Sequence, residues 1–122
     1  MGEVELTQTP HGLLLRLYLF GLPPGVHAVH VHTVGSCEPP FKSAGGHFNP
    51  DLTVHGVLNP EGPHAGDLPN IHMPKDGSLM VELFASQLSL DTGSYALLDA
   101  DGAAIIVHTG ADDYTSAPAG NA

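Results

Sequence analysis

The chain has few basic residues. Lys and Arg together number 3 against 13 Asp and Glu, and the formal net charge is −10 over 122 residues. A surface of that sign repels nucleic acid and anionic membrane surfaces, so neither is expected as a partner. No run of about 18 apolar residues is present, and the first residues lack the basic and apolar segments of a leader, so no membrane span or signal peptide is expected in this form of the chain.

Cysteine is nearly absent as well. Cys37 is the single cysteine, which excludes an internal disulfide and a thiolate-rich zinc site within these residues. Long helical periodicity is missing, and 15 glycines and 11 prolines divide the sequence into short runs. These features predict an all-β fold, and the length predicts a single domain over residues 1–122 with one core.

Short apolar runs bounded by turn signals predict about six strands. The first three runs are separated by the turn signals "TPHG" and "LPPG" and are predicted to form a meander. A compact hairpin is expected around "ADG". Residues 35–74 have no regular period and predict a long loop, which needs something to hold it in place. The predicted strands span residues 3–10, 12–22, 26–34 and 78–84, and the hairpin spans 95–108.

Histidine is abundant, with 9 copies, and three of them lie in "GVHAVHVH" at residues 25–32. Alternate side chains of a strand share a face, so His30 and His32 are expected to project together, roughly 7 Å apart at Cα. Such a pair can converge on one metal ion. Two partly exposed histidines on a polar strand face are the alternative reading of this pair alone.

Further candidate ligands lie in the long loop and after the last apolar run. Neutral imidazole suits copper and zinc, and three histidines with one carboxylate are a plausible tetrahedral zinc set. Because the free energy of binding a metal can contribute to folding, a metal would also explain how so long a loop stays ordered. The candidates are His47, His55, His64 and Asp67 in the loop, and His108 followed by Asp112 and Asp113.

Five motifs in order make the chain similar to the copper/zinc superoxide dismutase family in its bacterial form. They are "GVHAVHVHTVG", "SAGGHFNP", "HAGDLPNI", "KDGS" and "IIVHTGADDY". The resemblance covers most of the chain. It implies a Greek-key β-barrel or sandwich of immunoglobulin-like type, with a long metal-binding loop and two neighbouring metal sites.

The resemblance also implies roles for the candidate ligands. His47 would bridge the two metals and act as the catalytic proton carrier, and Asp112 would link a copper histidine to a zinc histidine through their outer nitrogens. Copper would be bound by His30, His32, His47 and His108, and zinc by His47, His55, His64 and Asp67.

The remaining candidates have simpler interpretations. His27 matches a position that the family uses structurally, and His11 and His72 are expected to be ordinary turn residues. Met73 is expected to pack and not to bind copper. Lys42 could attract superoxide, although a solvated lysine is the default interpretation.

The chain departs from the family pattern at both ends. The family's first strand, and its final segment with a second cysteine and an arginine, have no counterpart here, so Cys37 would lack its disulfide partner and the anion-guiding arginine would be missing. Two unpaired strand edges are therefore expected. If these residues are the whole molecule, the edges favour a homo-oligomer, such as a dimer, and the alternatives are a trimmed portion of a longer protein or a natural short homologue. The resemblance implies a periplasmic or extracellular location.

Three functions fit these features. The first is a superoxide dismutase that cycles copper beside a structural zinc and converts superoxide to dioxygen and hydrogen peroxide, with activity reduced by the missing arginine. The second is a copper- and zinc-binding module of the same fold with little or no turnover. The third is a structural zinc protein with an empty copper site. The complete ligand sets favour the enzyme.

Overall fold

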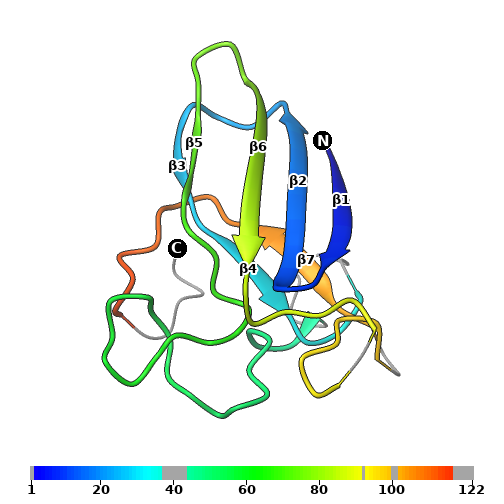
Figure 1. Ribbon diagram of the computed structural model, residues 1–122. Helices are drawn as coiled ribbons and strands as arrows, with labels where there is room; N and C mark the ends of the chain where they lie inside the picture. Colours follow the sequence, from blue (N-terminus) through cyan, green and yellow to red (C-terminus); the bar gives the residue numbers. More distant parts are fainter. Residues whose placement is uncertain (1, 37–43, 92, 100–101, 117–122) are drawn as a thin grey trace.

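A computed structural model describes residues 2–36, 44–91, 93–99 and 102–116 of the chain (Figure 1). Within these ranges the regular elements are all strands, and no helix is long and apolar enough to cross a membrane. The strands are β1 (Gly2–Thr9), β2 (Gly12–Phe20), β3 (Gly25–His27), β4 (Val29–His32), β5 (Ile71–Met73), β6 (Ser78–Ala85) and β7 (Ala104–Val107).

The largest sheet has the order β1-β2-β6, with both pairs antiparallel. Strand β2 alternates strictly, because its odd-numbered leucines face the core while its other side chains face outward. Leu13, Leu15 and Leu17 are fully buried. The opposite face carries exposed apolar side chains, such as Tyr18 and Met80, which are direct partners across β2 and β6.

Two shorter pairs close the other side of the core. Strand β3 pairs with β5, and β4 pairs with β7, both antiparallel (Figure 1). Val29 and Val31 of β4 are fully buried and belong to the same hydrophobic cluster as the β2 leucines. The three sheets therefore enclose one core, and the all-β Greek-key arrangement predicted from the sequence is confirmed.

Three details of the predicted topology are wrong. The first three runs do not form a meander, because β2 pairs with β6 and the third run pairs with β5 and β7. That third run is broken at Ala28, whose N–H donates to Gly110 O, and so it forms two strands. The first half of the predicted hairpin, residues 95–99, forms a turn, one bridge at Ala96 and bends in place of a strand, while its second half forms β7.

The long loop was also predicted too long, because residues 71–73 form β5. His72 therefore lies in a strand, opposite Val26, and not in a turn. The sequence did not predict this strand because a run of only three residues, followed by Pro74, is too short to show a period. His11 does lie in the turn between β1 and β2, as predicted, and Met73 is buried in the core. Cys37 and Lys42 lie outside the described residues.

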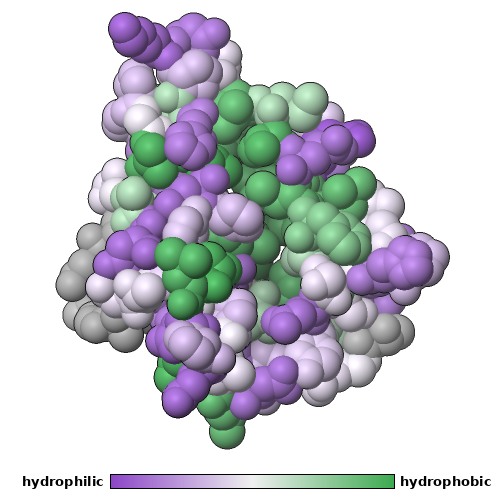
Figure 2. Space-filling model, turned by 60° about the vertical axis from the view of Figure 1, so that its left-hand side comes forward, coloured by the Kyte–Doolittle hydropathy of each residue, from purple (hydrophilic) through white to green (hydrophobic). Residues whose placement is uncertain are grey.

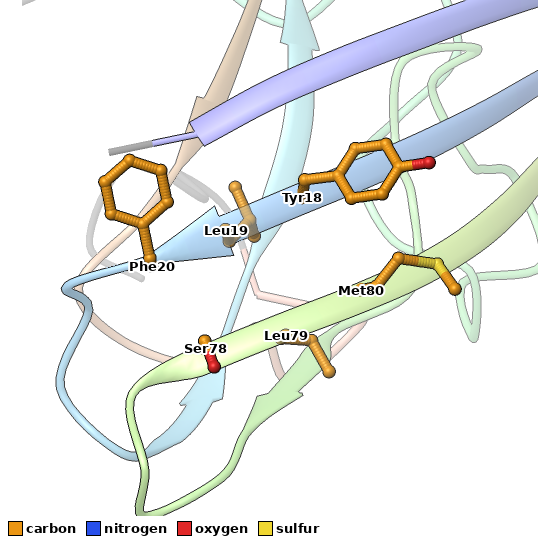
Figure 3. Close-up of a pocket in the computed structure, with 6 residues that line it drawn as sticks. All are labelled: Tyr18, Leu19, Phe20, Ser78, Leu79 and Met80. Carbon is orange, nitrogen blue, oxygen red and sulfur yellow. The ribbon is translucent and has the colours of Figure 1, made fainter.

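The surface combines hydrophilic and apolar regions. On the face shown in Figure 2, apolar side chains gather around a hollow near the middle, and hydrophilic side chains border them. One hollow of about 320 Å³ lies at the end of β2 and β6, beside Tyr18, Phe20 and Met80 (Figure 3). None of the six side chains that line it is a histidine or a carboxylate, so this hollow is separate from the predicted metal ligands.

Candidate metal centre

Strand β4 supplies the first two predicted ligands. His30 and His32 point away from the core, on the face opposite Val29 and Val31, as the two-residue period predicts. The N–H of His108 donates to Ala28 O over 2.9 Å, just beyond the β4–β7 pair. This extension of the pairing brings His108 beside His30, and His30 Nδ1 lies 3.0 Å from His108 Nε2.

The long loop is attached to the other edge of β4. Val31 donates its N–H to Gly66 O over 2.8 Å and accepts one from Phe48 N over 2.6 Å. Isolated bridges pair His30 with Asp67 and His32 with His47. The sequence left open what holds this loop, with a metal as one explanation. The structure shows that backbone hydrogen bonds to β4 also hold it and carry the loop ligands to the strand ligands.

One group of imidazole nitrogens therefore comes from β4, the loop and the segment after β7. One nitrogen from each residue lies within 4.8 Å of the others, close enough to share a metal ion, and the group consists of His30, His32, His47 and His108. This is the set that the sequence assigned to copper.

A second group surrounds Asp67. Its Oδ1 lies 2.8 Å from His47 Nδ1 and 3.5 Å from His64 Nδ1, and its Oδ2 lies 3.0 Å from His55 Nδ1. The two nitrogens of His47 and His64 are 3.2 Å apart. A tetrahedron with zinc–ligand bonds of about 2.0–2.1 Å has edges of about 3.3 Å, so the separations among His47 Nδ1, His64 Nδ1 and Asp67 Oδ1 fit a zinc site. The group whose ligand atoms all lie within 4.8 Å of one another consists of His30, His47, His55 and Asp67, and His64 adjoins it through His47 and Asp67.

His47 stands between the two groups. Its ring centroid is 4.0 Å from that of His30 and 5.2 Å from those of both His55 and His64. The Nδ1 atom faces Asp67, so the ring presents its two nitrogens to different groups. This is the placement that a bridging ligand needs.

Asp112 connects the groups on their far side. Its Oδ2 lies 2.8 Å from His30 Nε2, and its Oδ1 lies 2.9 Å from His55 Nε2. A ring that donates Nε2–H to this carboxylate has, in its neutral form, a lone pair on Nδ1. Hydrogen bonds of this kind set the tautomer and orientation of metal-binding histidines.

Two buried nitrogens lack a hydrogen-bond partner among the described residues, and one belongs to each group. His32 donates Nδ1–H to Gly45 O, which leaves Nε2 with a free lone pair. His55 Nδ1 lies near Asp67 but not in hydrogen-bond geometry. A buried polar atom without a partner costs free energy, and a bound cation would remove that cost at both positions. The residues present therefore fit a pair of metal ions.

Burial favours the neutral, metal-binding form of the copper-set rings. Burial, together with the neighbouring histidines, lowers the pKa of both His30 and His108 to about 4. Burial likewise lowers the pKa of His32. These rings are uncharged at neutral pH and present lone pairs to a cation.

Two carboxylates stay ionised beside them. Burial tends to raise the pKa of Asp67, but hydrogen bonds from His47 and from the N–H groups of Gly56 and His64 outweigh it and lower that pKa strongly. In Asp112 burial is again opposed, here by the hydrogen bonds from His55 and His30, and its pKa is lowered. The centre thus offers a fixed negative charge to a bound cation on each side.

Sequence reasoning missed several residues that support the centre. Asn70 and Tyr114 form hydrogen bonds around Asp112. Both residues lie inside the motifs "HAGDLPNI" and "IIVHTGADDY", but no role was predicted for either from the sequence. His27 was predicted to have a structural role. Its ring nitrogens lie 2.7 Å from Pro23 O and 2.8 Å from His108 O, so it helps to place His108.

Comparison with known proteins agrees with this geometry. Residues 1–122 match the family described as copper/zinc superoxide dismutase (SODC). Superoxide dismutase [Cu-Zn] 1 of Aquifex aeolicus is 49% identical over 125 residues, which cover 100% of this chain and 74% of the relative. The Caulobacter vibrioides superoxide dismutase [Cu-Zn] is also 49% identical, over 99% of this chain and 72% of the relative.

A solved structure supports the same assignment. The crystal structure of a SOD-like protein from Bacillus subtilis superimposes with a TM-score of 0.93 at 41% identity, covering 98% of this chain and 82% of that chain. Sequence, fold and the two ligand groups therefore agree, and the chain belongs to the copper/zinc superoxide dismutase family.

Proposed function

We propose that this chain, as one domain over residues 1–122, converts superoxide to dioxygen and hydrogen peroxide. Two superoxide ions and two protons are consumed for each pair of products. Copper supplies reversible one-electron chemistry, and zinc supplies a fixed positive charge without changing its oxidation state. The observation that carries the proposal is the presence of two adjoining ligand groups that have His30 and His47 in common, with His47 lying between them.

The ligand assignment is supported by the two buried nitrogens without a hydrogen-bond partner among the described residues, His32 Nε2 and His55 Nδ1. Copper is held by the histidines of the first group, and zinc by the three histidines and the carboxylate around Asp67. The assigned copper ligands are His30, His32, His47 and His108, and the zinc ligands are His47, His55, His64 and Asp67. His30 also lies close to the second group, but both of its nitrogens face other partners, His108 and Asp112, which argues for the copper site.

His47 is the residue assigned to proton delivery. Its Nδ1 is held at Asp67, while Nε2 remains for the copper group. A proton carried on Nε2 can pass to superoxide as superoxide is reduced beside the copper ligands. Asp112 keeps His30 and His55 in the required tautomers through its two oxygens, so the ring nitrogens that face the metals stay unprotonated.

The activity is tested on the chain loaded with both metals. We expect superoxide consumption in proportion to copper content, measured by pulse radiolysis on samples whose metals are counted by mass spectrometry. The zinc-only chain is the control. Turnover that is absent when both metals are bound would identify a metal-binding module and contradict the enzyme.

Two substitutions test the ligand assignment. His108→Ala removes a nitrogen from the copper group only, so copper affinity should fall by a factor of ten or more while zinc affinity is retained. Asp67→Asn removes the charged zinc ligand, so zinc affinity should fall while copper is retained. Competition with chelators measures both affinities. Equal loss of both metals from each substitution would refute the division into two sites.

We infer that two chains associate through the exposed edge of β1. Among the described residues this edge has no partner strand, because β1 pairs only with β2. Val4 is 37% exposed beside it, although it points to the core side of the sheet. An unpaired edge next to apolar side chains favours pairing with a second copy.

The association predicts a dimer in analytical ultracentrifugation of the metal-loaded chain. Val4→Lys places a charge beside the edge on the core side and should give a monomer. Thr7→Lys, on the outward side of the same strand, is the matched control and should leave the dimer intact. A monomeric unsubstituted chain would overturn the inference.

We also infer that the protein works in the periplasm or outside the cell. The support is its resemblance to the bacterial form of the family and Cys37, which matches a disulfide cysteine of the family and so suits an oxidising compartment. Fractionation of the cells that make the protein, followed by immunodetection, should recover it with periplasmic or extracellular markers. Recovery with cytosolic markers would contradict this location.

A further inference from the structure

Asp112 is held by a closed set of hydrogen bonds that the ligand assignment does not use. The Asn70 side chain donates Nδ2–H to Asp112 O and accepts Asp112 N–H on Oδ1, both over 2.9 Å. Tyr114 N–H donates to Asp112 Oδ1 over 2.8 Å. The Tyr114 hydroxyl in turn accepts Asn70 N–H over 2.8 Å. We call these three residues the Asp112 bracket.

The bracket joins the end and the middle of the long loop between β4 and β5 to the segment after β7. Asn70 lies three residues beyond Asp67, and Tyr114 O accepts the N–H of Leu58 over 3.1 Å. Gly56, next to His55, packs directly against Tyr114. A Cβ added to Gly56 would lie 2.0 Å from Tyr114 O, so no larger residue fits that contact. Tyr114 therefore lies against the backbone that carries His55.

Tyr114 makes these contacts from an unusual backbone conformation. Its φ is +70°, in the left-handed region that non-glycine residues rarely adopt. This turn directs Tyr114 N–H to the same oxygen, Oδ1, that accepts His55 Nε2–H. The hydroxyl reaches Asn70 in the opposite direction. Tyr114 thus holds the Asp112 carboxylate through its N–H group and holds Asn70, whose side chain binds the Asp112 backbone, through its hydroxyl.

We propose that Tyr114 is a positioning residue for the zinc group, acting through Asp112 and His55. Its hydroxyl holds Asn70 against the Asp112 backbone, and its N–H directs Oδ1 at His55. Without the hydroxyl, Asn70 N–H loses its acceptor and Asp112 Oδ1 has more freedom relative to His55 Nε2. His55 Nδ1 then presents its lone pair less accurately. This inference rests on the proposed zinc assignment of His55.

The test is Tyr114→Phe, which keeps the ring and removes only the hydroxyl oxygen. We expect zinc affinity, measured by competition with a chromophoric chelator, to fall by about tenfold, the low end of the effect of outer hydrogen-bond partners on metal sites. Cobalt(II) bound in place of zinc should show shifted visible absorption bands, because those bands report ligand angles. Tyr18→Phe, on the outward face of β2, is the matched control and should change neither.

A second variant separates positioning from folding. Asn70→Ala removes the two hydrogen bonds to the Asp112 backbone and should weaken zinc similarly, and the double variant should lose less than the sum of the two effects. A purely structural role would lower the unfolding free energy of the metal-free chain and leave zinc affinity and the cobalt spectrum unchanged, which would overturn the inference.

The unsubstituted chain distinguishes this failure from a failure of the proposed function. If the unsubstituted chain binds neither zinc nor cobalt, the zinc assignment and this inference both fall. If it binds zinc and Tyr114→Phe binds zinc equally well with the same cobalt spectrum, only the role of Tyr114 is refuted.

Discussion

The metal centre depends on backbone hydrogen bonding along both edges of one short strand, β4. On one edge, the pairing with β7 extends to the bond from His108 N–H to Ala28 O. On the other edge, Val31 binds the loop at Gly66 and Phe48. His47 and Asp67, which lie next to Phe48 and Gly66, are thereby brought beside His32 and His30 of β4. Because a strand has only two edges, this arrangement brings ligands from three distant parts of the sequence to one face.

The close approach of the loop to β4 restricts which residues can make it. A Cβ on Gly66 would lie 2.5 Å from Val31 O and 3.0 Å from Phe48. Glycine is therefore required where the loop meets the strand. Phe48 is buried in the core cluster, so the loop is also attached through apolar packing. Backbone bonds and packing thus support the ligand groups that the metals would complete.

Charge in the centre is arranged around two fixed carboxylates. Asp67 and Asp112 are both buried, and each accepts hydrogen bonds from histidine rings that the site holds in defined tautomers. The whole chain carries a formal −10, so attraction of an anionic substrate has to come from the bound cations. The neutral rings of His30 and His108 provide lone pairs for a cation without adding charge of their own, so the positive charge at the site would come from the metals.

The sequence by itself determined the fold class, the family and the identity of the candidate ligands. Strand alternation placed His30 and His32 on one face, and the order of five motifs assigned the remaining ligands. Tertiary structure alone decided the strand pairing, the break at Ala28 and the short strand β5, because hydrogen bonds between distant segments leave no local period. It also brought Asn70 and Tyr114 to Asp112, through contacts that span 42 and 44 residues of sequence. Both residues lie inside the motifs "HAGDLPNI" and "IIVHTGADDY", but a motif does not show which distant segments touch, and only the folded chain brings the two side chains to Asp112.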